Sequence, residues 1–459
     1  MAEITTFTKG PSTNSVHKSS SESPIEDAAR LKEMGYNQEL VRALTKWTTF
    51  GVGFSMINVP GAIFTLLYFG LAAGGPQGIL TAWPIVSFFS LLVALSLGEI
   101  LSAYPTSGGL YYWAAQLAGP KHGAFAGWVT GWFTWIGLIG VSAGSAFAFA
   151  EILTALIYAA PTGITPLPHG QELSSLRYKF LCVGGCIFVL LSVAILNSFG
   201  IKRLHIASWL WIPFNLSVTI IISAAIPVGA AVKGLPTISL KDLYGIWHNS
   251  TGLPDSWAAC IGVLMPCFLY VGHDAPAHMS EESKDAATSG SIAIVAAVLW
   301  GWFGWFTLWG VLSVIPPEDY YQLIYEPVTT VAGVDVWVRA VGGFGAVGLG
   351  ILLLVVQWTT MVSALAAQAR VTYAFARDNA LPFSKLWSRL TTTSRIPMNA
   401  LWLITILNIL LILPVFGSLT AYSALASIGT VAQYIGYSVP IFLRVIHSRH
   451  FPVGKFHLG

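Results

Sequence analysis

The chain has 459 residues and a formal net charge of +3, and 55% of its residues are hydrophobic while only 9% are charged. Soluble domains carry about a quarter charged residues, so this composition excludes a water-soluble fold. The mean hydropathy of +0.69, with 45 glycines and 24 prolines among long apolar runs, is typical of a polytopic membrane protein. The small net charge and the scattered Lys and Arg residues exclude nucleic acid as a partner.

The N-terminal residues differ from the rest of the chain. They are polar and lack the apolar stretch of a cleaved signal peptide. The first 25 residues are rich in Ser and Thr and are predicted to be a disordered tail, whereas Asp27 to Lys46 are predicted to form a short amphipathic helix. The sequence thus divides into a cytoplasmic N-terminal segment (1–46), a transmembrane core (47–446) and a cytoplasmic C-terminal segment (447–459).

Ten stretches in the core meet or approach the roughly 20 apolar residues that a spanning helix needs. They cover residues 47–71, 79–101, 123–160, 180–200, 204–232, 257–279, 289–315, 340–368, 398–416 and 419–443. Only three fully charged residues fall inside them: Glu99, Glu151 and Asp274. The sequence therefore predicts an all-α polytopic membrane protein.

The distribution of Lys and Arg predicts the orientation. If the N-terminus is cytoplasmic, the inner segments hold 18 of the 23 basic residues, as the positive-inside rule requires. Both termini are then cytoplasmic. The glycosylation sequon at Asn249 falls in a predicted outer loop and agrees with this orientation. The plasma membrane is the expected location, with vacuolar or other endomembranes as the alternative.

Two spans carry helix-breaking residues near their middles. The first contains Pro60 and Gly61, and the sixth contains Gly272 and Pro276 around the carboxylate of Asp274. Backbone groups in lipid must be satisfied internally, so breaks at matching positions of helices one and six predict a five-plus-five inverted repeat (LeuT-like) with a substrate site between them. Two ordinary proline kinks are the alternative.

The charged residues of the spans differ in their expected roles. Asp274 is costly at mid-membrane and is expected to serve an ion or substrate path. His273 titrates near neutral pH, so both residues are candidates for proton coupling, although His273 could instead only donate a packing hydrogen bond. Glu151 could be a paired structural carboxylate. Glu99 is expected to anchor the loop that follows it through backbone N–H groups.

Three blocks of sequence resemble a known superfamily. The first runs from Gly98 to Trp113, the second from Gly272 to Glu282, and the third from Ala369 to Pro382. The first block includes an inner-loop motif formed by Glu99, Tyr104, Pro105, Gly108 and Gly109. Together they resemble the amino acid–polyamine–organocation superfamily, and most closely its amino acid/choline branch, which includes fungal GABA and choline permeases and plant bidirectional amino acid transporters.

The resemblance implies the inverted-repeat fold and a substrate among amino acids, GABA, choline or related small amines. It places the substrate carboxylate at the break in helix one and the rest of the site at the break in helix six. The implied substrate-binding residues are Asn58, Pro60, Gly61, Ala62, Tyr270, Gly272, His273 and Asp274.

The chain also departs from the family pattern. Many relatives have an aromatic residue where His273 stands and a Thr-Gly pair in place of Gly61-Ala62, and some carry a lysine in helix five that is missing here. The family usually has twelve helices, whereas this chain stops at Gly459, in the loop before the eleventh, so helices 11 and 12 are expected to be absent.

Other motifs are interpreted as structural. The GxGxxG sequence at Gly343 opens a membrane helix and lacks the strand that a dinucleotide site needs. The hydroxyl cluster of Thr359, Thr360 and Ser363 could contact an ion or substrate, but bonding back to its own helix is the alternative. The four cysteines and ten histidines show no metal-ligand spacing, and neither a metal nor a cofactor is expected.

The sequence thus predicts a secondary transporter, not an enzyme, that moves a small amine or amino acid by alternating access with proton symport. Uniport or exchange is the next alternative. A nutrient-sensing receptor on a transporter scaffold is a further alternative. An intramembrane enzyme is the third and is disfavoured, because Asp274 has no second intramembrane Asp as a catalytic partner. The oligomeric state is left open.

Overall fold

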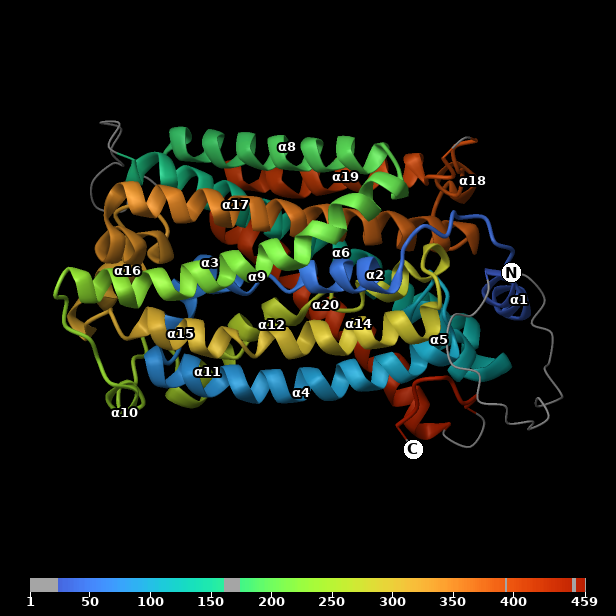
Figure 1. The fold of residues 1–459 in the computed structure, drawn as a ribbon, viewed down its shortest axis with the longest axis horizontal. Helices are drawn as coiled ribbons and strands as arrows, with labels where there is room; N and C mark the ends of the chain where they lie inside the picture. Colours follow the sequence, from blue (N-terminus) through green and yellow to red (C-terminus); the bar gives the residue numbers. More distant parts are fainter. Residues whose placement is uncertain (1–23, 161–173, 393, 448–450, 459) are drawn as a thin grey trace.

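The computed structural model describes residues 24–160, 174–392, 394–447 and 451–458. Helices follow one another along most of these ranges, and the described part of the chain forms no strand beyond two isolated bridges. Figure 1 shows the long helices running along the longest axis of an elongated bundle. The prediction of an all-α fold is confirmed. Residues 1–23, which carry most of the tail predicted to be disordered, lie outside the described ranges.

The helices vary from single turns to spans of more than ten turns. In the first part of the chain they are α1 (Pro24–Glu33), α2 (Lys46–Met56), α3 (Val59–Ala72), α4 (Gly75–Ala103), α5 (Leu110–Leu117), α6 (Gly119–Ala159), α8 (Leu176–Ser198), α9 (Ile201–Val232) and α10 (Leu240–Leu243). In the second part they are α11 (Asp255–Gly262), α12 (Leu264–Tyr270), α13 (Ala275–His278), α14 (Ala286–Gly301), α15 (Gly304–Leu312), α16 (Tyr320–Tyr325), α17 (Ala332–Arg377), α18 (Ser384–Trp387), α19 (Met398–Ile412) and α20 (Leu419–Ile446).

The predicted spans agree with these helices. Within the described residues, nine helical stretches are long and apolar enough to cross a membrane, from Lys46–Ala72 to Met398–Phe416, and they match the first nine predicted spans. The tenth predicted span, 419–443, lies within α20. A helix satisfies its own backbone hydrogen bonds, which is what a segment without access to water requires.

Two helices depart from their predicted lengths, and a glycine accompanies each departure. The amphipathic helix predicted for Asp27–Lys46 ends already at Glu33, and Gly35 follows with a φ of 89°. The eighth span is longer than predicted, since α17 runs over 46 residues, with a break in its helical geometry at Gly342 (φ 82°, ψ 170°). Both glycines adopt backbone angles that favour glycine over other residues.

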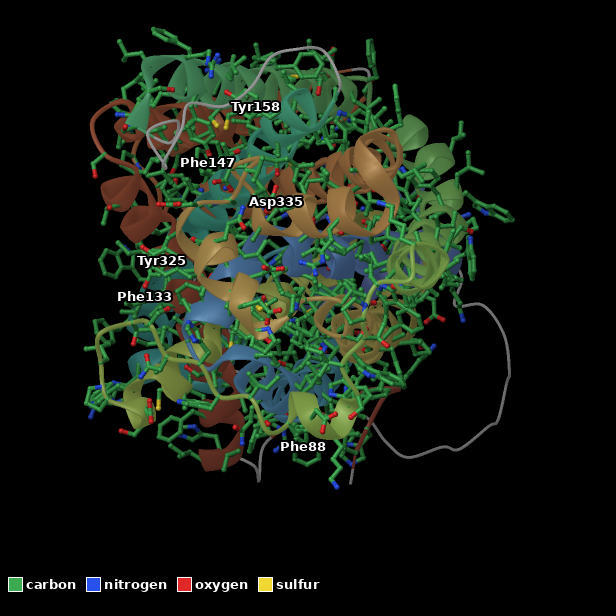
Figure 2. The ribbon with its side chains drawn as sticks, turned by 90° about the vertical axis from the view of Figure 1, so that its left-hand side faces the viewer. Phe88, Phe133, Phe147, Tyr158, Tyr325 and Asp335 are labelled. Carbon is green, nitrogen blue, oxygen red and sulfur yellow. The ribbon has the colours of Figure 1, made fainter. Side chains whose placement is uncertain are left out.

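The bundle has a packed aromatic interior and an apolar rim. Trp83, Trp113 and Trp337 are fully buried, and the Trp337 ring lies 4.6 Å from that of Phe64, centroid to centroid. Figure 2 views the molecule from the end that carries α16 and shows Phe88 at the edge, where its side chain is half exposed. Apolar exposure on a rim is what lipid contact predicts, because lipid tails are as apolar as these side chains.

The described ends of the chain lie at the same end of the bundle. Figure 1 places both termini on the right, with α5 and α18, whereas α10 and α16 lie at the opposite end. A chain that crosses the membrane an even number of times has both ends on the same side, so this arrangement agrees with the ten predicted spans. That the end with the termini is cytoplasmic stays a prediction from the basic residues.

Candidate substrate-binding site

The first break separates α2 from α3 at Ile57 and Asn58. Asn58 is the N-cap of α3: its Oδ1 accepts a hydrogen bond from the N–H of Gly61 at 3.0 Å, and its carbonyl accepts one from Ala62 at 3.0 Å. Pro60 lies in the first turn, where its missing N–H has no helical partner to lose. The predicted break is therefore present, and the positive end of the α3 dipole faces it.

Helix α17 supports this break from the side. The Oε1 of Gln357 accepts a hydrogen bond from the Nδ2 of Asn58, and the Nε2 of Gln357 donates to the carbonyl of Ser145 in α6 at 3.1 Å. A methyl group at Gly61 would lie only 2.6 Å from the Gln357 oxygen, so a larger residue does not fit there. Gln357 thereby joins α3, α6 and α17 at the start of α3.

The hydroxyl cluster of the eighth span lies beside the last turn of α2. Thr360 donates to the carbonyl of Ser55 at 2.8 Å, and the hydroxyl oxygens of Ser363 and Ser55 are 2.7 Å apart. Thr359 and Thr360 also bond back to the carbonyl of Val356, at 2.8 and 3.0 Å. The hydroxyls thus bond back to their own helix, as the alternative interpretation predicted. Two of the three, those of Thr360 and Ser363, also connect α17 to α2.

The second break lies between the end of α12 at Tyr270 and the start of α13 at Ala275. Gly272 has a φ of 89°, which only glycine adopts without strain, and its N–H donates to the hydroxyl of Tyr437 at 2.9 Å. A methyl group at Gly272 would approach the Cε of Met56, the last residue of α2, to 2.5 Å. The two predicted breaks therefore lie against each other.

His273 occupies the middle of the second break and is 1% exposed. Its Nδ1 lies 2.6 Å from the carbonyl oxygen of Tyr270, and its ring centroid is 4.8 Å from that of Tyr437. In the part of the chain that the structure describes, its Nε2 is buried without a hydrogen-bond partner. One nitrogen of His273 thus makes the packing hydrogen bond that the alternative interpretation expected, whereas the other nitrogen has no hydrogen-bond partner.

Asp274 is fully buried, and its carboxylate binds three side chains. Tyr437 donates to Oδ1 at 2.7 Å, whereas the Nε2 atoms of His278 and Gln433 lie 2.9 and 3.2 Å from Oδ2. Gln433 and Tyr437 belong to α20, so this carboxylate connects the second break to the tenth predicted span. A buried carboxylate needs such donors, because an unpaired charge in this environment is very costly.

The Tyr270 side chain contacts α4 and α14. Its hydroxyl lies 2.6 Å from that of Ser87 in α4, and its ring packs so closely on Gly301 of α14 that no side chain fits at that glycine. Its backbone carbonyl contacts His273 in the second break. Of the implied binding residues, Tyr270 therefore contributes backbone and packing at the break.

The loop after α4 is fixed by a carboxylate other than the predicted one. Glu281 is 0% exposed, and its Oε1 accepts hydrogen bonds from the N–H of Ser107 at 3.2 Å and the hydroxyl of Thr106 at 3.3 Å. Both of its oxygens also bind the guanidinium of Arg377, at 3.0 and 3.1 Å. The prediction that Glu99 holds this loop through backbone N–H groups is wrong.

Glu99 instead holds the C-terminal segment. Its Oε1 lies 2.8 Å from the Nδ1 of His457 and 3.6 Å from the guanidinium of Arg444. The N–H of Phe456 donates to the hydroxyl of Ser102 at 2.8 Å, close to the same helix end. These partners lie more than 340 residues away in sequence, so local spacing gave no sign of them.

The other motif residues shape the loop itself. The carbonyl of Tyr104 accepts a hydrogen bond from the Nε1 of Trp113 at 2.9 Å, and Pro105 follows it in the non-helical turn. Gly109 has a φ of 51°, and a methyl group there would approach the His278 ring to 2.8 Å. The loop therefore contacts the histidine that binds Asp274, and the Nδ1 of His278 lies 3.4 Å from the carbonyl of Ser107. A methyl group at Gly108 would lie 3.0 Å from the Tyr111 side chain and 3.1 Å from the Cβ of Tyr112.

Two further carboxylates hold α17 at this end of the bundle. Arg370 binds Glu282 through two nitrogens, at 2.9 and 3.2 Å, and burial raises the pKa of the Glu282 carboxyl against the opposing effect of Arg370. Asp378 accepts hydrogen bonds from the hydroxyls of Tyr36 and Tyr111, at 2.8 and 2.9 Å. Burial likewise raises the pKa of Asp378, and these hydroxyl donors only partly counter it.

Comparison with known proteins agrees with this architecture. Residues 44–456 match the family described as amino acid permease. The chain belongs to this family. It is 33% identical over 452 residues to amino-acid permease BAT1 of Arabidopsis thaliana, covering 95% of this chain and 85% of that one. It is 32% identical over 444 residues to the amino-acid permease BAT1 homolog of Oryza sativa subsp. japonica, covering 94% and 83%.

A third relative has a different name. The chain is 28% identical over 429 residues to the choline transporter of Saccharomyces cerevisiae, covering 92% of this chain and 72% of that one. The resemblance to the amino acid/choline branch is confirmed. With its long apolar helices, this member of the permease family is a multi-pass integral membrane protein and is of the transporter class.

Several site residues escaped the sequence analysis. Gln357, Gln433, Tyr437 and His278 make the contacts that hold the two breaks, yet none was singled out. His278 could have been found, because it lies four residues after Asp274 and so on the same helical face. Gln433 and Tyr437 have the same spacing on α20, but their partner lies about 160 residues away.

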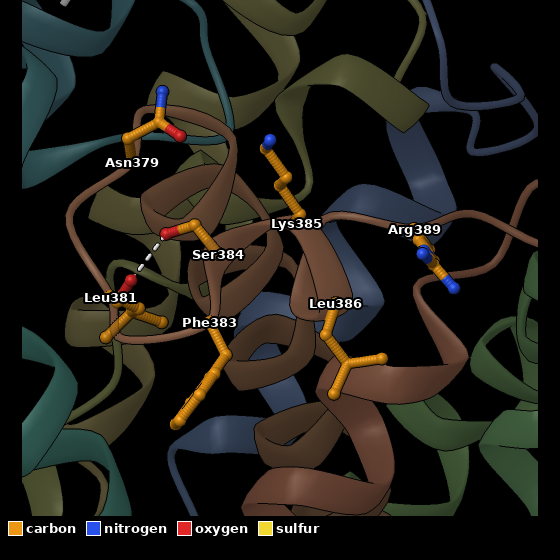
Figure 3. Close-up of a pocket in the computed structure, with 7 residues that line it drawn as sticks. All are labelled: Asn379, Leu381, Phe383, Ser384, Lys385, Leu386 and Arg389. Atoms are coloured by element: carbon orange, nitrogen blue, oxygen red, sulfur yellow. Dashed lines mark hydrogen bonds between the residues drawn. The ribbon is translucent and has the colours of Figure 1, made fainter.

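One pocket lies apart from the breaks. A pocket at the loop between α17 and α18 is lined by Asn379, Leu381, Lys385 and Arg389 among others, with the Ser384 hydroxyl bonded to the Leu381 carbonyl at 2.6 Å (Figure 3). It contains none of the predicted site residues. Among the described residues, no group of three or more His, Cys, Asp or Glu could hold a metal ion.

Proposed function

We propose that this protein is a secondary transporter of amino acids or related small amines, such as GABA or choline, that works by alternating access in a five-plus-five inverted repeat. One observation carries the proposal: two interrupted helices, α2–α3 and α12–α13, meet through Gly272 and Met56 inside a chain of the amino acid permease family. Interrupted helices of this kind form substrate sites at mid-membrane in transporters. The names of the relatives support the substrate class.

The substrate carboxylate binds at the start of α3, beside Asn58, Pro60, Gly61 and Ala62. The dipole of this 14-residue helix favours a negative charge there. The rest of the substrate faces Gly272 and His273, while Tyr270 and Asp274 fix the backbone of the second break. Asn58 exchanges part of its hydrogen bonding with Gly61 and Gln357 for contacts with the substrate.

We infer that the face with the two termini is closed in this conformation, because ion pairs bridge its segments. The ion pairs of Glu281 with Arg377 and of Glu282 with Arg370 join the segment after α13 to α17, and Glu281 adds the inner loop. Opening toward the cytoplasm requires these contacts to separate. The inner-loop motif, including Tyr104, Pro105, Gly108 and Gly109, therefore acts in gating rather than in binding.

Proton symport through Asp274 is the preferred coupling, with His273 as second candidate. Asp274 and His278 form a fully buried pair, and His278 approaches the inner loop at Ser107. This arrangement supports a proton route from the cytoplasmic face to the second break. Buried acidic and histidine residues are the usual proton relays within membranes. Facilitated uniport or exchange is the alternative.

The test is uptake by the purified protein in liposomes. Labelled GABA, choline and a set of amino acids are offered with and without an inward proton gradient, and gradient-driven accumulation of at least one of them is expected. Asp274→Asn and His273→Ala should lower uptake at least tenfold. Glu151→Gln is the matched control, because Glu151 is bonded to Tyr178 in another part of the bundle.

Each outcome has a distinct meaning. Uptake that does not respond to the gradient would overturn symport and leave uniport or exchange. Saturable binding without uptake would identify a nutrient-sensing receptor instead. Undiminished uptake in both site variants would refute the proposed site.

The membrane and the topology need separate evidence. We place the transporter in the plasma membrane with both termini cytoplasmic. Impermeant thiol labelling of single cysteines introduced at His122 and at Tyr321, both exposed but in opposite predicted locations, distinguishes the two orientations. Labelling from outside is expected at position 321 only.

A further inference from the structure

The unsatisfied nitrogen of His273 bears on which substrates the site accepts. The side chain is 1% exposed, and its Nε2 has no partner among the described residues. The other nitrogen, Nδ1, lies 2.6 Å from the carbonyl oxygen of Tyr270, which can only accept a hydrogen bond. Nδ1 therefore carries the hydrogen. In a neutral imidazole with this tautomer, Nε2 offers a lone pair and is an acceptor.

The surroundings of the ring favour this neutral acceptor form, which supports Asp274 over His273 as the carrier of the coupling proton. Both oxygens of the neighbouring Asp274 are already bonded, to Tyr437 on one side and to His278 and Gln433 on the other. A charged ring would therefore present a second N–H without any acceptor in the described structure. Leaving a buried charge or donor unpaired costs more than leaving a lone pair unpaired.

The position of the ring completes the argument. His273 follows Gly272, which packs against the last residue of α2, where the first break begins. The start of α3 thus offers a site for a negative group, while the unpaired Nε2 lone pair of His273 offers a hydrogen-bond acceptor in the adjoining break. These two features complement the two ends of a zwitterion whose ammonium group carries at least one N–H.

Within the substrate class proposed above, and resting on that transport function, we propose that His273 favours amino acids and amines with an ammonium N–H, such as GABA, and discriminates against quaternary ammonium compounds such as choline. A primary, secondary or tertiary ammonium donates an N–H to Nε2. A trimethylammonium group has no N–H, so it leaves the nitrogen unsatisfied and displaces any water that could bond to it. Removal of a buried hydrogen bond to a charged group weakens binding by about 10- to 100-fold.

The decisive experiment is a methylation series. Glycine and 4-aminobutyrate, each with zero, one, two or three N-methyl groups, compete with whichever labelled amino acid the liposomes accumulate. We expect the inhibition constant to change little up to two methyl groups and then to rise about 10- to 100-fold at the third. The step falls there because the third methyl removes the last N–H, whereas steric exclusion would weaken binding progressively with each methyl.

Variants at position 273 provide a second measurement. His273→Phe keeps a ring but has no acceptor, and its face can attract a trimethylammonium group. The step should disappear or reverse in this variant, while His122→Phe, at an exposed position, should behave as wild type. If His273→Phe does not fold, the series on the wild-type protein alone still decides.

The results separate this inference from the proposed function. Competition by the trimethylated compound within threefold of the dimethylated one would overturn the role of His273 while leaving transport intact. A gradual decline over the series would overturn it as well. Absence of uptake of every labelled compound would refute the transport function itself.

Discussion

The ion pair between Glu281 and Arg377 should stabilise the closed face far more than an exposed pair does. Glu281→Gln removes the negative charge and leaves the guanidinium of Arg377, whose side chain is only 15% exposed, without its carboxylate. Removing one partner of a buried pair costs about 3–5 kcal/mol. The lower end applies here, about 3 kcal/mol, because Arg377 keeps a contact over the Tyr36 ring at 4.0 Å.

The opposite end of the bundle offers a matched control. Asp319 and Arg339 also pair, but their side chains are 31% and 33% exposed, so Asp319→Asn should cost less than about 1 kcal/mol. Globular proteins gain about 2.1 cal/mol/K of unfolding entropy per residue. For 459 residues this is about 1 kcal/mol/K, so the expected decreases in Tm are about 3 °C and under about 1 °C.

Thermal unfolding can be followed in detergent with a thiol-reactive dye. Cys182 and Cys186 are buried and react only when the bundle opens, whereas the exposed Cys260 is first replaced by Ser to lower the background. A second readout is labelling of Thr106→Cys, whose wild-type hydroxyl faces Glu281. Glu281→Gln should accelerate this labelling. Equal Tm values for the two variants, or unchanged labelling, would refute the reasoning that this pair closes the face.

Three other predictions follow from the breaks and from the face that carries the termini. Gly272→Ala should lower the free energy of unfolding by about 1–3 kcal/mol and abolish uptake, because the φ of 89° disfavours a side chain and the new methyl would approach Met56 to 2.5 Å. A normal Tm together with normal uptake would contradict this. Tyr437→Phe should destabilise the protein by about 1–3 kcal/mol, because Asp274 loses its 2.7 Å donor; Tm in detergent measures this, and no change would mean that the bond contributes nothing. For Asp378 the raised pKa means that the folded state holds the proton more tightly than the unfolded chain, so this group stabilises below its ordinary pKa of 3.8 and loses that contribution as the pH rises through the higher folded value. The Tm of Asp378→Asn relative to wild type should therefore increase over that interval, and a difference independent of pH would contradict the assignment.

Glu99 and Asp274 illustrate how far the sequence could be used for single residues. The low charge of the spans singled out both carboxylates, and both are buried in the structure. Their partners could not be predicted, since Glu99 binds Arg444 and His457 while Asp274 binds Gln433 and Tyr437. Helix packing brings these residues together across more than 150 positions, and one sequence contains no signal for such pairs.

The helices and their interruptions followed from the sequence alone, because they depend on local physics. A stretch of about 20 apolar residues must form a helix in lipid. Pro60 lacks the N–H that a helix interior needs, and Gly272 permits a positive φ that other residues avoid. What the tertiary structure decided is which groups are used. It left the Nε2 of His273 unsatisfied while it bonded Asp274 on both oxygens, and it assigned the inner loop to Glu281 instead of Glu99. Whether a buried side chain finds hydrogen-bond partners depends on residues distant in sequence, and only the packed bundle brings those residues close.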